Sequence, residues 1–495
     1  MSLATVDLPR RDTRGVIAAG IFGATLGLVV LLLIVRQYVA SIFSFHIWGG
    51  LVATTVLTAL CSLLLLRLAR KDPDPRLGAI LVGAFVVKQL GTFLRYYVVV
   101  YMLGGDALDY HDAGAALAPA MRAFDFGAPV FEEFAPDAIS GTVFIRLFTG
   151  AVYAVIGTSR LAGFVVFSTL GFWGLYLAFR AFRIAVPEGN HRRLALLLFL
   201  TPTLIFWPSS TGKDSVLLFC IGLTLYGAAR LFTHNTFGIP LLAFGLLLSA
   251  VVRPHLTVLL LAGLVIGRAL GRVSRRTDKG VVRRVGGKVV MIGFLAAAVV
   301  LTAGRASTFF NVDELGADSV TAILDETQRR SSQGDSAFEP TRVTSPIGLP
   351  MAVVTVLFRP FPNEVHNAQQ VASALETTVL LAITLASWRT LIRLPRFMRR
   401  YPLIAFAVVF ILLFVVAFSA VGNFGILARQ RSQVLPMLFM VLALPAVRPR
   451  RKRDRYPAAT NSFAPRPEPA AVGAGPGAGA GRPALASVPG EQDPG

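Results

Sequence analysis

Residues 161–179, LAGFVVFSTLGFWGLYLAF, contain no charged side chain and lie between Arg160 and Arg180. A helix needs about 20 apolar residues to cross a bilayer, and about 17 suffice where flanking charged side chains reach the interface. This stretch therefore predicts a membrane-spanning helix. The whole chain of 495 residues points the same way, because 54% of its residues are hydrophobic and only 15% are charged. These proportions predict a polytopic membrane protein rather than a soluble domain.

Similar apolar runs recur along the chain and predict an all-α fold, a bundle of about 12 transmembrane helices with extracytoplasmic loops. The predicted spans are residues 16–35, 47–66, 77–99, 161–179, 194–207, 215–232, 239–252, 256–270, 289–303, 371–386, 403–420 and 433–447. Two further apolar stretches, residues 142–156 and 351–358, are expected to be interfacial or re-entrant helices.

The basic residues predict the orientation of these spans. If the N-terminus is cytoplasmic, every cluster of Lys and Arg between spans falls on the inner side, as the positive-inside rule requires. We therefore expect a multi-pass protein of the plasma membrane with both termini in the cytoplasm. The net charge of +21 comes largely from Lys and Arg in short loops beside the apolar runs, where they set the orientation. It therefore does not indicate nucleic-acid binding.

The same threading divides the chain into three parts. They are a cytoplasmic N-terminus (1–15), a transmembrane domain (16–447) and a basic, then disordered, cytoplasmic tail (448–495). The tail is rich in Pro, Ala and Gly, and such a composition buries too little apolar surface to offset the entropy of folding. Two long outer segments, 104–141 and 304–350, are expected to form an extracytoplasmic cap.

The first outer segment begins Gly104-Gly105-Asp106, where the glycines permit a tight turn at the membrane surface. Asp106 and Tyr110 are four residues apart and share one face of a helix. In this arrangement the carboxylate could act as the base that deprotonates an acceptor, and the phenol ring could support a sugar. The alternative is that Asp106 only caps an ordinary juxtamembrane helix.

Three further motifs bring polar residues to the same predicted side of the membrane. They are Ser209-Ser210-Thr211-Gly212-Lys213-Asp214, Arg359-Pro360-Phe361-Pro362-Asn363-Glu364 and Arg429-Gln430-Arg431. Lys213 is not part of a phosphate-binding P-loop, because Asp214 replaces the Ser or Thr of that motif. Both residues are expected at the start of the next helix, either as ligands or as a helix cap with a lysine that reaches the interface.

Positive charge on the outer side runs against the positive-inside trend and needs a partner. Arg429 and Arg431 precede the last span, and a lipid phosphate or pyrophosphate suits them because guanidinium groups bind phosphate bidentately. Lipid headgroups or acidic loops are the alternative partners. Arg359 and Glu364 flank a Pro-Phe-Pro turn whose fixed backbone can hold a charged pair in one geometry.

The order of these features resembles the GT-C-type glycosyltransferases: a span, the outer Asp-xxx-Tyr segment, an interfacial helix leading into Gly157-Thr158-Ser159-Arg160-Leu161, then many more spans. The three motifs above are similar to those of uncharacterised actinobacterial membrane proteins of the same GT-C-like kind. In relatives that resemble the protein O-mannosyltransferases and the lipid A aminoarabinose transferases, the sugar comes from a polyprenyl-phosphate carrier and an outer Asp is the general base. The resemblance implies this role for Asp106, with Asp109 in reserve.

We therefore expect an inverting transferase that moves a sugar from polyprenyl phosphate to an envelope glycan, lipid or protein acceptor. Arg429 would stabilise the leaving phosphate. The expected substrate-binding and donor-phosphate-binding residues are Tyr110, His111, Lys213, Arg253, Arg359, Glu364, Arg429 and Arg431. Two alternatives stay open: an envelope polysaccharide polymerase or ligase, and a non-enzymatic transporter or flippase of lipid-linked sugars.

A divalent cation that bridges the carrier phosphate is a further hypothesis. His111, His255 and His366 are all expected on the outer side, close to the outer carboxylates. The chain has no HExxH or comparable local ligand pair, so the alternative is that these are ordinary interfacial histidines.

One lysine is expected inside the membrane. Lys88 lies near the middle of the span at residues 77–99, where a charged side chain is costly and usually pairs with another group. We expect it to pair with Glu376 or to face an aqueous cavity.

Overall fold

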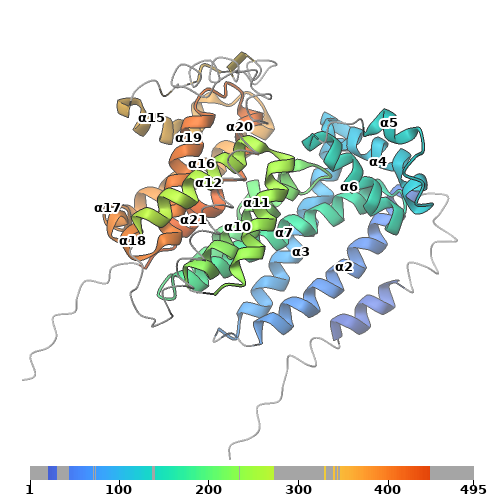
Figure 1. Cartoon of the computed structure of the whole chain (residues 1–495), viewed down its shortest axis with the longest axis horizontal. Helices are drawn as coiled ribbons and strands as arrows, with labels where there is room; N and C mark the ends of the chain where they lie inside the picture. Colours follow the sequence, from blue (N-terminus) through green and yellow to red (C-terminus); the bar gives the residue numbers. More distant parts are fainter. Residues whose placement is uncertain are drawn as a thin grey trace, which may run out of the picture. The chain divides into compact units, whose positions relative to one another are not determined.

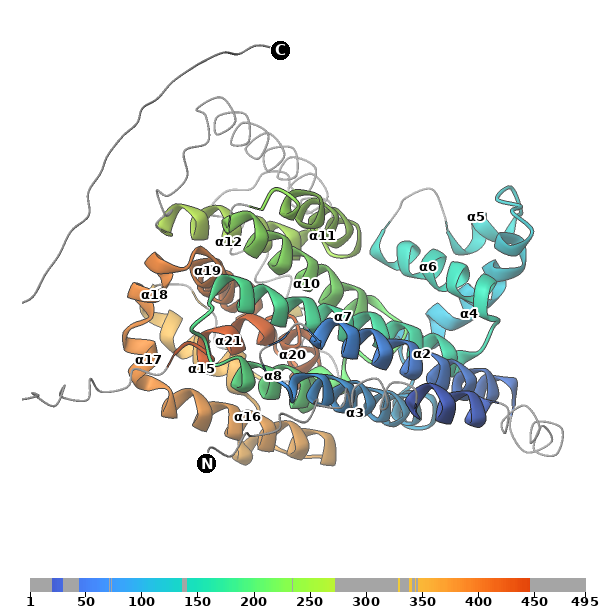
Figure 2. The ribbon, with the colours of Figure 1, turned by 90° about the horizontal axis from the view of Figure 1, so that it is seen from below.

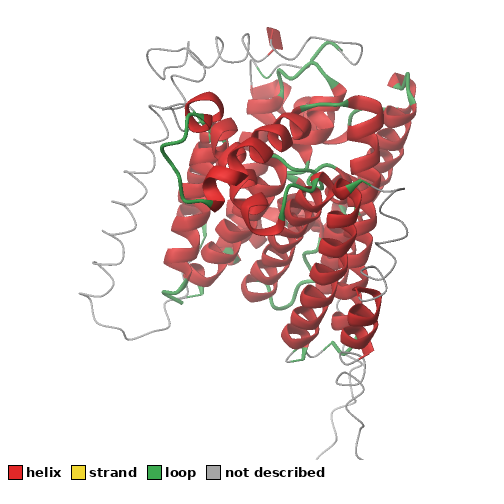
Figure 3. Cartoon of the chain, turned by 90° about the vertical axis from the view of Figure 1, so that its right-hand side faces the viewer, coloured by secondary structure: helices red, strands yellow, loops and turns green. Residues whose placement is uncertain are grey.

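The computed structural model describes residues 20–29, 44–70, 72, 74–135, 140–233, 235–271, 328–329, 338–340, 343 and 346–445. Helices and no strand are found in this part of the chain (Figure 3), so the predicted all-α class is confirmed. The chain divides into a unit of residues 1–447 and a unit of residues 448–495 that lies outside the described residues.

Within the described residues, five helices are long and apolar enough to cross a membrane. They are α2 (Phe45–Ala69), α3 (Leu77–Val98) with its π-helical extension η1 (Val99–Leu103), α7 (Arg160–Ala185), α10 (Lys213–Phe232) and α16 (Ala368–Ala386). Shorter apolar helices are Gly20–Val29, α6 (Gly141–Ile156), α11 (Gly238–Val252), α12 (Pro254–Leu270), α15 (Leu349–Phe358) and α19 (Pro402–Phe418). These helices support a membrane protein, while the predicted span at residues 289–303 lies outside the described residues.

The remaining described elements are short. They are α4 (Asp106–Arg122), α5 (Val130–Phe134), α8 (His191–Leu200), α9 (Pro202–Phe206), η2 (Pro346–Gly348), η3 (Pro362–Glu364), α17 (Trp388–Ile392), α18 (Leu394–Arg400), α20 (Phe424–Arg431) and α21 (Leu435–Leu442). The first predicted outer segment forms α4 and α5, and α4 packs on α6 (Figure 1). Most of the second outer segment lies outside the described residues.

Helices α7 and α10 lie side by side at the centre of the packing, and α2 and α11 flank them (Figure 2). Their close approach depends on small residues, as is typical of membrane helices. A Cβ on Gly222 of α10 would collide with the Gly174 carbonyl of α7, and a Cβ on Gly174 would collide with the Leu218 carbonyl.

Within the described residues, basic side chains from several helices gather at one end of the helices, which we call the basic end. Arg183, near the end of α7, pairs with Asp72 in the α2–α3 connection. Arg193 donates to Ser387 over 2.7 Å. A second ion pair, between Arg400 and Glu188 over 2.5 Å, joins the same end. The 26 residues of α7 rise by about 39 Å, so its other end at Arg160 lies a bilayer thickness away.

The predicted span at residues 194–207 is wrong as a single helix. The segment breaks at Thr201-Pro202 into α8 and α9 and then continues as the turn that leads to α10. Pro202 causes the break, because it lacks an N–H and disfavours a helical conformation at the preceding residue. Thr201 accordingly has an extended backbone, with φ −71° and ψ 122°.

Two charged side chains from other helices satisfy the backbone at this interruption. Lys88 of α3, which is 2% exposed, donates from Nζ to the carbonyls of Leu204 over 2.8 Å and Pro208 over 3.0 Å. Glu376 of α16 accepts the N–H of Thr203 over 2.9 Å. The expected Lys88–Glu376 pair is therefore wrong. The break leaves backbone groups without helical partners in an apolar interior, and Lys88 and Glu376 each form hydrogen bonds with these groups instead of with each other.

Replacing Lys88 by Met should lower the free energy of unfolding by about 2 kcal/mol or more, since the α9 carbonyls lose their donor. The measurement is denaturant unfolding of the purified protein in detergent. Leu90→Met is the matched control, because Leu90 lies on the same helix and is 63% exposed. Equal stability of the two variants would contradict this role of Lys88.

Candidate functional site

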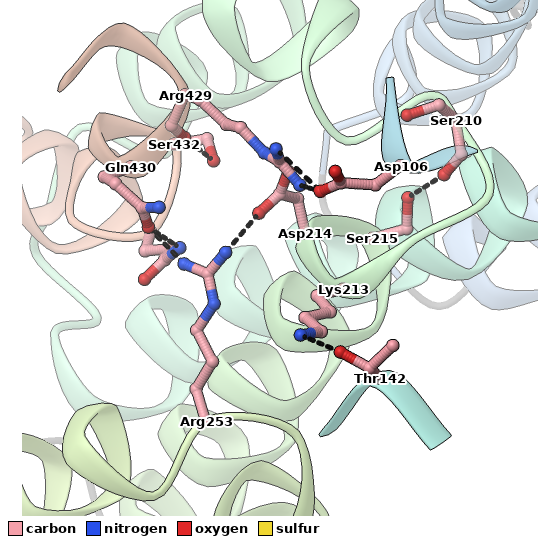
Figure 4. A network of polar contacts seen from close by, with 11 residues as sticks. Asp106, Thr142, Ser210, Lys213, Asp214, Ser215, Arg253, Arg429, Gln430 and Ser432 are labelled. Carbon is pink, nitrogen blue, oxygen red and sulfur yellow. Dashed lines mark hydrogen bonds and ion pairs between the residues drawn. The ribbon is translucent and has the colours of Figure 1, made fainter. Parts of the chain in front are cut away.

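A network of charged side chains surrounds Asp214, at the end of α10 opposite the basic end (Figure 4). The Asp214 carboxylate accepts a hydrogen bond from Nε of Arg429 and another, over 3.3 Å, from Nη2 of Arg253. The Arg429 guanidinium also reaches Asp106 at the start of α4, with Nη1 3.3 Å from Oδ2. The structure therefore brings together Asp106, the expected base, and Arg429, an expected phosphate-binding residue.

We define the Asp214 network as Asp106, Lys213, Asp214, Arg253, Arg429 and Gln430. The Asp214 side chain is only 7% exposed, whereas that of Asp106 is 59% exposed. Asp214 thus holds the two arginines in a low-dielectric setting, and its charge raises the pKa of Arg429. Asp106 stays open to a ligand that arrives from outside the protein.

The local sequence places each member of the network. The predicted start of α10 at Lys213 is confirmed, and the acidic second residue interacts favourably with the helix dipole. Lys213 donates to Thr142 of α6 over 2.8 Å. Arg253 is the extended residue between α11 and α12, where Pro254 forces a new helix to begin. Gln430 of α20 accepts a hydrogen bond from Arg253.

The glycines before Asp106 adopt the conformations that only glycine favours. Gly104 has φ 66° and Gly105 has φ 112°. They turn the chain sharply from the end of α3 into α4, so that Asp106 is the first residue of the helix and Gly105 occupies the cap position. The predicted tight turn is confirmed, and Asp106 directs its carboxylate at Arg429 instead of capping the helix.

The neighbours of Asp106 on α4 have different surroundings. Tyr110 is buried beside the network, and burial together with Asp106 raises its pKa. His111 lies on another face of the helix, where its Nδ1 is 2.8 Å from the hydroxyl of Tyr153. Asp109 is exposed and takes part in no hydrogen bond or ion pair with the described residues. The structure therefore does not bring His111 or Asp109 into the network.

Arg431 also lies outside the network, although it follows Arg429 by two residues. Side chains two apart on a helix point in nearly opposite directions. Arg431 is 1% exposed and donates to the backbone carbonyl of Arg359. Within the described residues, its Nε and Nη1 have no hydrogen-bond partner.

The predicted charged pair at the Pro-Phe-Pro turn is confirmed. Arg359 donates from Nε to Glu364 over 2.8 Å, and the other carboxylate oxygen accepts the N–H of Phe361 over 2.9 Å. The guanidinium also stacks on Phe338, 4.5 Å from the ring centroid. The Arg359 carbonyl accepts a hydrogen bond from Arg431 of α20, whereas no contact joins this pair to Asp214 among the described residues.

The sequence analysis missed Arg95, which lies on α3 close to the network. Its guanidinium carbon is 4.8 Å from the ring centroids of both Phe206 and Trp207. Its charge interacts with those of Arg429 and Asp214. The available signal was a lone arginine inside an apolar span, since such residues are costly and usually functional.

The predicted histidine set for a cation is not assembled in the part of the chain that the structure describes. No group of three or more His, Cys, Asp or Glu side chains gathers there in a way that could hold a metal ion. His111 is bonded to Tyr153, while His255 is the second residue of α12 and His366 precedes α16.

A cavity of about 270 Å³ lies at the basic end, away from the Asp214 network. It is lined by Asp72, Arg183, Asn190, His191 and Arg192, among others. Asp72 and Arg183 neutralise each other there. We therefore regard the Asp214 network as the stronger candidate site, because its charges converge from four separate segments.

Asp214→Asn should lower the free energy of unfolding by about 3 kcal/mol, because Arg253 loses its counter-charge and Arg429 keeps only its contact with the exposed Asp106. Asp106→Asn should cost less than about 1 kcal/mol, because this carboxylate is mostly exposed. Unfolding of both purified variants in denaturant measures the difference. An equal decrease in the free energy of unfolding of the two variants would show that Asp214 does not stabilise the network more than Asp106 does.

The His111 environment predicts a pH effect on stability. Burial, with Arg160 and His46 nearby, lowers the pKa of His111 from 6.5 to about 4. Between these values the unfolded chain binds a proton that the folded chain does not, so stability falls as the pH decreases from 6.5 towards 4. Thermal unfolding at pH 7 and pH 5 should show a smaller drop for His111→Gln than for the wild type. His366→Gln, which changes an exposed histidine, should keep the wild-type drop, and parallel behaviour of all three would refute the effect.

Comparison with known proteins adds no relative. A scan against family models, a search of curated proteins and a search of solved structures each found no match for this chain.

Proposed function

We propose that this chain is a GT-C-type glycosyltransferase of the plasma membrane, which moves a sugar from a polyprenyl-phosphate carrier to an acceptor of the cell envelope. The observation that carries the proposal is the Asp106–Arg429–Asp214 contact. It places an exposed carboxylate beside a guanidinium that a buried carboxylate holds in position.

The charges of the network favour a phosphate ligand. Lys213, Arg253 and Arg429 carry three positive charges against the two negative charges of Asp106 and Asp214. A phosphodiester donor adds one negative charge and therefore balances the set. The polyprenyl phosphate released by the reaction carries up to one more. The proton that Asp106 accepts removes one negative charge from the network, so its positive charges can balance the second charge of the leaving group as it forms.

The proposed reaction inverts the anomeric carbon. Asp106 accepts the proton of the acceptor hydroxyl, and the oxygen attacks the anomeric carbon of the donor sugar. The bond between that carbon and the carrier phosphate oxygen breaks, and its electron pair stays on the phosphate. Arg429 interacts with the new charge, so its contact with Asp106 gives way to the phosphate during the cycle. Tyr110, buried beside Asp106, contributes a wall next to the sugar.

The distribution of charge also supports an orientation. We propose that the basic end faces the cytoplasm and that the Asp214 network faces outwards, as the positive-inside rule favours. Nucleotide sugars are cytoplasmic, so a lipid-linked donor is the form of activated sugar that reaches this side. The count of about 12 spans is part of this proposal.

A transporter of lipid-linked sugars is the second candidate, and one observation favours it. Interrupted helices at membrane depth are a common feature of transporters, and α8–α9 is such a helix. However, Lys88 and Glu376 bond to the backbone of α9, so these charges are used to hold the interruption. The exposed carboxylate at the network favours transfer.

The transferase proposal predicts that Asp106→Asn and Arg429→Ala each reduce sugar transfer by at least about 100-fold, because one removes the base and the other the phosphate contact. The measurement is transfer from a panel of polyprenyl-phosphate sugars in membranes that contain each variant, with folding and expression checked. Asp109→Asn is the matched control on the same helix and should keep wild-type transfer.

Two results would contradict the proposal. Loss of transfer in Asp109→Asn with full activity in Asp106→Asn would move the base to Asp109. Carrier-dependent movement of the lipid-linked sugar across the membrane, without transfer to any acceptor, would favour the transporter.

A further inference from the structure

Arg95 is an arginine inside an apolar span, and its position is fixed by aromatic rings. It lies eight residues before the end of the span at Leu103, which corresponds to about 12 Å along the helix. Phe206 and Trp207 both contact its guanidinium at 4.8 Å. A cation–π contact of this kind attracts the charge of the guanidinium without using its N–H groups as hydrogen-bond donors.

The hydrogen-bonding capacity of Arg95 is unused. Within the described residues it makes no hydrogen bond and no ion pair, and its buried Nε has no partner. The other arginines beside the network differ in this respect. Arg253 is bonded to Asp214 and Gln430, and Arg429 is bonded to Asp214 and Asp106.

Arg95 also changes the charge balance around the site. Its charge interacts with Arg429, Asp214 and Asp106. With Arg95 included, four positive side chains face two carboxylates in the described part of the chain, so two positive charges have no counter-charge there. An arginine buried in a span without an acidic partner is costly unless a ligand supplies one.

We propose that Arg95 is an anchor for the phosphate group of a lipid phosphate ester that enters from the bilayer. The free edge of its guanidinium donates to the phosphate oxygens, while Arg429 contacts the same group from the α20 side. The position of Arg95 along the span suits a headgroup that is attached to a membrane-embedded tail. This inference rests on the proposed function for the location of the phosphate, but it can be tested without any transfer assay.

Binding to the full-length protein in nanodiscs tests the anchor. The probes are farnesyl phosphate, inorganic phosphate and farnesol. The readouts are the midpoint of thermal unfolding and the fluorescence of Trp207, in a background where Trp48, Trp173 and Trp388 are replaced by Phe. Farnesyl phosphate should bind, and Arg95→Gln should weaken it by at least about tenfold, since a hydrogen bond to a charged group is worth that much. Arg95→Lys should retain part of the affinity, because the charge remains without the planar edge.

Arg230→Gln is the matched control. Arg230 also stacks on an aromatic ring, with its guanidinium 5.3 Å from the Tyr226 centroid, but it lies near the opposite end of α10. Its replacement should leave the affinity for farnesyl phosphate unchanged. The fluorescence response should vanish in Trp207→Phe, while the thermal shift persists.

Several results would overturn the anchor. These are equal farnesyl phosphate affinity in folded Arg95→Gln and wild type, a fluorescence response that persists in Trp207→Phe, and binding of farnesol as tight as that of its phosphate. Inorganic phosphate that binds as tightly as farnesyl phosphate would contradict the lipid source. If Arg95-dependent binding is found but no sugar is transferred, the anchor stands and the proposed transferase function fails.

Discussion

The arrangement of this site depends on one buried carboxylate. Asp214 accepts hydrogen bonds from Arg253 and Arg429, and these three residues come from segments that are far apart in the sequence. Burial makes each charge costly alone, so the cluster is stable only with its partners in place. Because Asp214 fixes one edge of the Arg429 guanidinium, the rest of that group is available to Asp106 or to a ligand. The buried Asp214 thus fixes the position of the Arg429 guanidinium, which contacts the exposed Asp106.

The interrupted segment α8–α9 explains how Asp214 reaches this position. A continuous helix would carry its residues past the network, whereas the break at Thr201-Pro202 and the turn after α9 bring the chain to the start of α10. Lys88 and Glu376 hold the break by bonding to its backbone. The two charges that bond to this backbone therefore support the segment that leads to Asp214 and its network.

Sequence patterns could predict much of this fold, because α7 and α10 each contain a long apolar run that can be recognised without knowledge of its packing partners. The break before α9 could not be predicted with the same rules, since membrane helices tolerate proline when other groups satisfy the backbone. Its partners are more than 100 residues away in sequence. Lys88 was accordingly assigned to the wrong partner, although a buried charge was correctly expected to have one.

The candidate site was predictable in part for similar reasons. Asp106 stood out by its position after two glycines, and Arg429 because positive charge on the predicted outer side is unusual. The threading placed them on the same side, but their contact is seen only in the structure. Arg431 shares that signal but lies on the opposite face of a short helix whose rotation the sequence does not define. Arg95 was missed because a single arginine in an apolar run indicates a functional residue without indicating its partner.

The most direct test of the transferase account is an experimental structure of the protein in a nanodisc with farnesyl phosphate bound. The account predicts phosphate density within about 3 Å of the Arg429 guanidinium, on the side of the network that faces Asp106. It also predicts that the Asp214–Arg429 contact persists while the Asp106–Arg429 contact opens. Phosphate bound at the basic end, or an unchanged Asp106–Arg429 contact with the ligand elsewhere, would contradict it.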